Sequence, residues 1–247
     1  MPKLGVNDEL VPVKGTFGFS AAKIDADTLG ASEYTLVTIV VDTSGSVGAF
    51  KDDLEKQIGE VVKACRHSQR AENLMVRVVF FADGVQEFHG FKKLMDCNPG
   101  DYAGQIFCGG MTALYDATYA GIEATKIYGK DLDAKDYTVN AVAFFITDGC
   151  ENASTLKQDV AEIRDLLKAT VKEEALESIL TVLIGINPGE ASQELEDFKN
   201  DAGLSQYVEA PDSDFKTLAK IGAFVSNTIS STSAALGTGG PSAPLNF

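Results

Sequence analysis

Three short motifs in this sequence carry side chains whose types and spacing could do chemistry. Residues 42–46 (Asp-Thr-Ser-Gly-Ser) supply a carboxylate and two hydroxyls at alternate positions, with a glycine that lets the backbone bend. Residues 109–114 (Gly-Gly-Met-Thr-Ala-Leu) add a hydroxyl, and residues 147–149 (Thr-Asp-Gly) add a second carboxylate. The five candidate metal ligands, all through oxygen, are Asp42, Ser44, Ser46, Thr112 and Asp148.

Oxygen ligands of this kind suit magnesium, manganese or calcium and suit zinc and copper poorly. Neutral hydroxyls next to a divalent cation leave much of its charge uncompensated, and magnesium keeps exchangeable waters in its shell. An open coordination position then attracts a carboxylate. These residues therefore predict a metal site, for Mg²⁺ first and Mn²⁺ or Ca²⁺ as alternatives, that binds an Asp or Glu of a partner protein.

The elements that must position these motifs follow from the hydrophobic pattern. Apolar, largely β-branched runs predict strands over 35–41, 74–82, 139–147, 179–186 and 207–208, with a looser hairpin strand over 85–94. Apolar residues at helical spacing predict helices over 50–65, 113–128, 159–171, 192–200 and 215–229. Strands that are apolar throughout are typical of a parallel sheet that is covered on both faces.

The predicted fold class is therefore α/β: a doubly wound, mostly parallel sheet with one antiparallel edge strand and helices on both faces. In such sheets, ligands bind beyond the carboxyl ends of the strands, where the strand order reverses. The first and third motifs directly follow the strands at 35–41 and 139–147, and the second leads into the helix at 113–128. We expect the three loops to meet at one end of the sheet.

The motifs Asp-x-Ser-x-Ser, Gly-Gly-x-Thr and Thr-Asp-Gly, in this order and at these places, resemble the metal-ion-dependent adhesion site of von Willebrand factor A domains. The resemblance covers nearly the whole folded part of the chain and implies a Rossmann-like fold. It also implies that Ser44 and Ser46 bind the metal directly and that Thr112 does so when a ligand is present. Asp42 and Asp148 would then act through water.

The resemblance divides the chain into three parts. Residues 34–229 form the predicted von Willebrand factor A domain, and residues 1–33 an N-terminal extension. Residues 230–247 are rich in Ser, Gly and Pro, so we expect a flexible tail that buries no core.

Composition limits the partners. The chain has 36 acidic and 21 basic residues and a net charge of −15, so nucleic acid is a poor partner. An acidic protein partner needs a local positive centre, which a bound cation would supply; the overall repulsion is largely screened beyond about 8 Å at physiological salt. No apolar run approaches the roughly 18 residues of a membrane span. Four widely spaced cysteines and the lack of an apolar leader predict a cytoplasmic protein with free thiols.

Two other functions stay open beside the non-enzymatic binding module. One is a self-assembling structural subunit, a homo-oligomer in which the N-terminal extension and the tail mediate the contacts and the site could also bind an acidic residue of a neighbouring copy. The other is a metal-dependent phosphohydrolase, which the sequence disfavours. Ser44 stands where one phosphatase type has its second Asp, and the sequence has no phosphate-binding Gly-Lys-Ser/Thr loop. We therefore expect no enzymatic activity.

Several residues near the motifs have simpler interpretations. Asp116 lies in the first turn of a predicted helix, where a carboxylate favours the helix dipole. Asp83, Glu87 and Asp101 could rim the site, although ordinary solvation explains these acidic residues better. His67 and His89 are predicted at the surface or the sheet edge.

Overall fold

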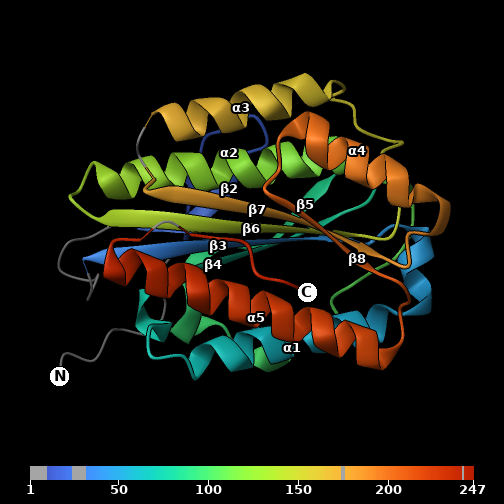
Figure 1. The fold of residues 1–247 in the computed structure, drawn as a ribbon, viewed down its shortest axis with the longest axis horizontal. Coiled ribbons are helices and arrows are strands. Elements are labelled where there is room, and N and C mark those ends of the chain that lie inside the picture. Colours follow the sequence, from blue (N-terminus) through green and yellow to red (C-terminus); the bar gives the residue numbers. More distant parts are fainter. Residues whose placement is uncertain (1–9, 24–31, 174–175, 241) are drawn as a thin grey trace.

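The computed structural model describes residues 10–23, 32–173, 176–240 and 242–247, which form an eight-stranded sheet with helices on both faces (Figure 1). The strands are β1 (Leu10–Val13), β2 (Phe19–Ala22), β3 (Glu33–Asp42), β4 (Leu74–Phe81), β5 (Val85–Lys93), β6 (Thr138–Thr147), β7 (Ser178–Ile186) and β8 (Gln206–Ala210). The α-helices are α1 (Lys51–Arg66), α2 (Leu114–Asp133), α3 (Val160–Lys172), α4 (Ser192–Ala202) and α5 (Phe215–Thr238). A short 3₁₀ helix, η1 (Gly45–Ala49), precedes α1.

The strand order is β1-β2-β5-β4-β3-β6-β7-β8. Strands β4, β3, β6, β7 and β8 are parallel, and β5 pairs antiparallel with β4. This confirms the predicted α/β class with its mostly parallel sheet and antiparallel edge. The sheet continues beyond the predicted edge strand, because β2 pairs parallel with β5 and β1 pairs antiparallel with β2. Part of the predicted N-terminal extension thus belongs to the sheet.

The central strands are buried because both of their faces are covered. Nine of the ten residues of β3 are buried, as are all of those in β4. Alternate side chains point to opposite faces. Val37, Ile39 and Val41 pack toward the layer of α1 and α5, while Val40 packs toward α2, α3 and α4. Figure 1 shows these two helical layers on opposite sides of the sheet.

The β1–β2 hairpin is joined to the sheet by a buried ion pair. Arg77, in the middle of β4, donates from Nε to Glu87 Oε2 on β5 at 2.8 Å. The other oxygen, Glu87 Oε1, accepts from the backbone N–H of Ser20 at 2.9 Å and from its hydroxyl at 2.5 Å. A Cβ on Gly90 would lie 1.9 Å from the Ser20 carbonyl oxygen, so only glycine lets β2 approach this closely. Glu87 is therefore a structural residue of the sheet and does not rim the candidate site.

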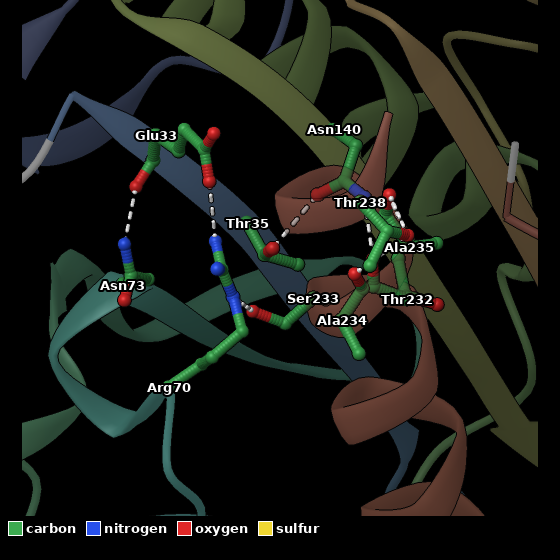
Figure 2. A network of polar contacts seen from close by, with 10 residues as sticks. All are labelled: Glu33, Thr35, Arg70, Asn73, Asn140, Thr232, Ser233, Ala234, Ala235 and Thr238. Atoms are coloured by element: carbon green, nitrogen blue, oxygen red, sulfur yellow. Dashed lines mark hydrogen bonds and ion pairs between the residues drawn. The ribbon is translucent and has the colours of Figure 1, made fainter. Parts of the chain in front are cut away.

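The last helix is nine residues longer than the predicted end at residue 229, since α5 continues to Thr238. Its added turns have little apolar surface, and polar contacts hold them to the sheet (Figure 2). Asn140 on β6 accepts from the Thr35 hydroxyl at 2.7 Å and donates to the Thr232 carbonyl at 2.7 Å. Arg70 donates to Ser233 Oγ at 3.0 Å and to Glu33 Oε2 at 2.8 Å.

The described residues after α5 also contact the sheet. The Ser242 hydroxyl lies 2.8 Å from that of Ser178, and the Gln206 side chain donates to the Leu245 carbonyl at 2.8 Å. The Phe247 ring packs edge-on against Phe224. Residues 230–238 of the predicted tail therefore belong to α5, and polar contacts supply what their composition lacks. The division into three parts stays a prediction.

No helix in the described part of the chain is long and apolar enough to cross a membrane. All four cysteines lie within the described residues, and all are free: Cys65, Cys97, Cys108 and Cys150.

Replacement of Asn140 by Ala tests the polar anchor of α5. The change leaves the buried Thr35 hydroxyl without its partner and removes the side-chain bond to the Thr232 carbonyl, so we expect the free energy of unfolding to fall by about 1–3 kcal/mol. Urea unfolding measures this loss. Asn200→Ala, on the exposed side of α4, is the matched control and should change stability by less than about 0.5 kcal/mol. Equal stability of the two variants would contradict the anchor.

His89 predicts a pH dependence of stability. The structure corrects its predicted position at the surface or the sheet edge: the side chain is buried in β5, with Nε2 3.0 Å from the Tyr102 hydroxyl. Burial lowers the pKa of His89 from 6.5 to about 4. Between these values the unfolded chain binds a proton that the folded chain does not, so stability falls as pH falls from 6.5 to about 4.

The full effect of this shift is about 3 kcal/mol. Urea unfolding of the wild type and of His89→Gln at pH values above and within this interval measures it. We expect the variant to lose less stability on acidification than the wild type. His67→Gln, at an exposed histidine, is the control and should follow the wild type. If the free energies of unfolding of the wild type and His89→Gln differ by the same amount at every pH, the result would argue against a buried neutral histidine.

Candidate metal centre

The predicted site residues lie at the carboxyl ends of two adjacent parallel strands. Asp42 is the last residue of β3 and Thr147 the last of β6, and the register that pairs Val41 with Ile146 places these two ends side by side. The loop after β3 continues into η1, and the loop after β6 begins with Asp148. Parallel pairing thus brings together two motifs that are about a hundred residues apart in the chain.

Asp42 is fully buried and both of its oxygens are hydrogen-bonded. Oδ1 accepts from the backbone N–H of Ser44 at 2.7 Å, and Oδ2 accepts from the Thr147 hydroxyl at 2.6 Å. Burial raises the pKa of Asp42, while these hydrogen bonds lower it and partly offset the effect. The carboxylate therefore joins the ends of β3 and β6 and carries a charge that the protein itself compensates poorly.

A chain of hydrogen bonds continues from the first loop to the third. The hydroxyls of Ser44 and Ser46 lie 3.2 Å apart, and Ser46 Oγ donates to Asp148 Oδ1 at 2.9 Å. Burial also raises the pKa of Asp148, which is partly exposed. Four of the five predicted ligands, Asp42, Ser44, Ser46 and Asp148, therefore form one connected polar cluster.

Thr112 lies in the adjoining loop, which is fixed to the cluster through the backbone. The Gly45 N–H donates to the Gly110 carbonyl at 3.3 Å, and the Gly109 N–H donates to the Thr43 carbonyl at 3.0 Å. The Thr112 N–H donates to Asn152 Oδ1 at 2.7 Å. Among the described residues the hydroxyl of Thr112 makes no hydrogen bond to the other four candidate ligands. The structure thus brings the Thr112 loop to the site and leaves this hydroxyl outside the hydrogen-bonded cluster.

Three further residues support the site and were not among the predicted ligands. Thr147 holds Asp42, and the Thr-Asp-Gly motif already contained it. Asn152 holds Thr112 from both sides, because its own N–H donates to the Thr112 carbonyl at 2.9 Å. Asp83, for which the sequence allowed either a place at the rim of the site or ordinary solvation, accepts from the Met111 N–H at 2.7 Å. Asp83 directly follows the strand predicted over 74–82, which was a usable signal.

Asp116 has a larger role than its predicted interaction with the helix dipole. It does lie in the first turn of α2, and its carboxylate also accepts the N–H groups of Thr155, Leu156 and Lys157 at 2.6–3.3 Å. Glu151 completes this arrangement by accepting the Tyr115 N–H at 2.7 Å. The loop that follows Asp148 is therefore held against the start of α2.

The donor set fits a hard divalent cation. Its candidate ligand atoms are carboxylate and hydroxyl oxygens, which Mg²⁺, Mn²⁺ and Ca²⁺ prefer. Neither Asp42 nor Asp148 has a Lys or Arg partner among the described residues. In that part of the chain, no three His, Cys, Asp or Glu side chains gather as a metal site, so any metal here would depend on the hydroxyls. Two poorly compensated carboxylates next to hydroxyl oxygens can hold such a cation.

Protein-family models and curated proteins give no match to this chain. Several solved structures do match this chain in fold. A von Willebrand factor type A structure from Catenulispora acidiphila matches with a TM-score of 0.53 and 16% identity, over 81% of this chain and 43% of that one. The PilB minor pilin from Streptococcus sanguinis matches with a TM-score of 0.54 and 17% identity, over 83% of this chain and 63% of the pilin.

The pilus adhesin SpaC from Lactobacillus rhamnosus GG, in an open conformation, matches with a TM-score of 0.54 and 10% identity, over 83% of this chain and 31% of the adhesin. This chain therefore spans less than two thirds of the length of each of these structures. At such identities the matches establish a shared fold, and they confirm the predicted von Willebrand factor A-like architecture.

Gly110 tests how tightly the Thr112 loop is held. Its φ is +76°, and a Cβ at this position would lie 2.3 Å from Asp83 Oδ2. We expect Gly110→Ala to lower the free energy of unfolding by about 1–3 kcal/mol, because backbone strain and the clash with Asp83 act together. Gly109→Ala is the matched control, since a Cβ there meets nothing within 4 Å and φ is not positive. Urea unfolding compares the two, and equal losses would contradict the close contact between the loop and Asp83.

Proposed function

We propose that this chain is a non-enzymatic binding module of the von Willebrand factor A type, which holds a divalent cation and through it binds an acidic residue of a partner protein. The observation that carries the proposal is the hydrogen-bonded cluster at the ends of β3 and β6, whose two carboxylates have no Lys or Arg partner in the part of the chain that the structure describes. The residues proposed to hold the cation are Asp42, Ser44, Ser46, Thr112 and Asp148.

Each of these residues has a separate task in the proposal. Ser44 and Ser46 offer neutral hydroxyl oxygens as direct ligands, as the family resemblance implies. Asp42 and Asp148 lie behind them and act through water, where they orient the hydroxyls and supply negative charge. The bound cation would supply an electrophilic centre for a carboxylate oxygen. Magnesium is the first choice, because it accepts oxygen ligands and keeps exchangeable waters; manganese and calcium are the alternatives.

The charge of the chain supports a local mode of recognition. At a net charge of −15, an acidic partner gains nothing from the long-range field, so its attraction must come from the site itself. The neutral inner ligands serve this need, because they leave the cation undercompensated. The cytoplasmic location expected from the sequence is part of the same proposal.

The names of the structural neighbours also favour binding over catalysis. One is a minor pilin, another is a pilus adhesin and a third is proximal thread matrix protein 1 of the mussel byssus, at a TM-score of 0.51 and 20% identity over 80% of this chain. These names describe adhesive and structural proteins, and their likeness to this chain concerns the fold. They support self-assembly as a second candidate, in which the acidic residue belongs to another copy.

Titration of Mg²⁺ into the metal-free protein by calorimetry tests the metal site. We expect one saturable site in the wild type. Asp42→Asn removes the buried charge and keeps the side-chain shape, so the affinity should fall about 10- to 100-fold, as for residues that support metal ligands. Asp101→Asn, at an exposed carboxylate, removes the same charge and should bind as the wild type. Circular dichroism checks that both variants are folded.

Two results would reject the metal site: binding of none of magnesium, manganese and calcium by the wild type, or unchanged binding by Asp42→Asn. Manganese and calcium titrations then show which ion is preferred. Light scattering with and without magnesium separates the two candidate functions, because self-assembly predicts a metal-dependent increase in mass and binding of a separate partner does not.

A further inference from the structure

Two large apolar side chains next to the candidate metal centre are exposed to solvent. Phe107 is 84% exposed and Met111 is 54% exposed. Both belong to the loop that carries Thr112, one on each side of the pair Gly109 and Gly110. Single exposed apolar residues are common on protein surfaces, but two on one loop beside a proposed binding site are a candidate contact surface. We call Phe107 and Met111 the apolar rim.

The loop is held in place by polar groups on both sides of the rim. On one side, Glu55 of α1 accepts the backbone N–H groups of Gly104 at 2.7 Å and of Ile106 at 2.6 Å. Ile106 is buried in the core, so the next side chain, Phe107, points outward. The fold therefore anchors this end of the loop without burying the phenylalanine.

On the other side, backbone contacts fix the position of Met111. Asp83 accepts the Met111 N–H, and the Gly109 and Ala113 N–H groups donate to the carbonyls of Thr43 and Ala82 at 3.0 and 2.7 Å. The backbone of the rim is therefore fixed, so a partner that covers it orders only the two exposed side chains.

We propose that the apolar rim packs on an apolar side chain next to the acidic residue that the metal centre binds. This inference rests on the proposed function and specifies its partner: a protein segment in which an Asp or Glu has an aromatic or aliphatic neighbour. The surroundings argue for this choice. Charge alone would favour a basic neighbour, because Asp83, Asp148 and the chain as a whole are acidic. The side chains that the loop actually presents are apolar, and apolar burial is not weakened by the net negative charge.

Short synthetic peptides with a central Glu test the inference. Three sets differ in the residues beside the Glu, which are Phe and Leu, Ser and Gly, or Lys, and a fourth set has Gln in place of the Glu. Fluorescence anisotropy with the full chain, in magnesium and in chelator, measures affinity. We expect metal-dependent binding of the Glu peptides, tightest with apolar neighbours.

The variants are Phe107→Ser and Met111→Ser. Each should weaken binding of the apolar-flanked peptides about tenfold and leave the Ser- and Gly-flanked peptides unchanged, because loss of a buried anchor costs more than about 1 kcal/mol. Val171→Ser is the matched control. Val171 is 66% exposed near the end of α3. Because α3 leads into the start of β7, whereas the metal centre lies beyond the end of the parallel strand β6, Val171 lies at the opposite end of the sheet. Since all three side chains are exposed, we expect wild-type unfolding midpoints.

The outcomes distinguish the rim from the proposed function. Metal-dependent binding of all Glu peptides with equal affinity, or an apolar preference that survives in Phe107→Ser, overturns the rim and leaves the metal-dependent recognition standing. Absence of any Glu-specific, metal-dependent binding overturns the proposed function and the rim with it. A magnesium-dependent increase in mass that Phe107→Ser abolishes would show that the rim packs against a second copy, which overturns the assignment to a separate partner.

Discussion

The carboxylate of Asp42 is the group on which the rest of the candidate site depends. It ends β3, is buried, and divides its two oxygens between its own loop, through the Ser44 N–H, and the neighbouring strand end, through the Thr147 hydroxyl. These two bonds fix where the first and third motifs lie relative to each other. Burial of this carboxylate away from water is unfavourable in the folded protein, and its raised pKa reflects this cost. The fold tolerates this charge at the place where a cation would stabilise it.

The loops around this carboxylate follow a common rule: acidic side chains accept backbone N–H groups. Glu55 holds one end of the Thr112 loop and Asp83 the other, while Asp116 and Glu151 hold the loop after β6. Loops expose many backbone donors, and a carboxylate satisfies two or three of them at once. Some of the acidic residues that give this chain its negative charge therefore hold the loops of the site in place. Rigid loops in turn allow apolar side chains to stay exposed without collapsing inward.

A second set of polar contacts stabilises parts of the sheet away from the candidate site. Asn140 and Arg70 bind the later turns of α5 where apolar packing is sparse, and Arg77 with Glu87 joins β2 to the sheet through β4 and β5. Leaving one member unpaired in such a buried network is costly, which makes the network specific for one arrangement of the chain. Polar contacts therefore attach the later turns of α5 and the strand β2 to the parallel core. These two elements depart most from the predicted ones.

The sequence by itself determined the parallel core and the convergence of the motifs. Runs such as 35–41 and 139–147 are mostly apolar and β-branched or aromatic, as is typical of strands buried on both faces, and each is followed at once by oxygen-bearing residues. Tertiary structure alone decided the pairing of β2 with β5, the extension of α5 to Thr238, and the roles of Asp83 and Asp116. The physical reason is the sequence distance over which each feature is set. Hydrophobic periodicity is a property of neighbouring residues and predicts which of them are buried. The hydrogen-bond partner of a carboxylate or an amide depends on which distant backbone groups the completed fold brings close to it.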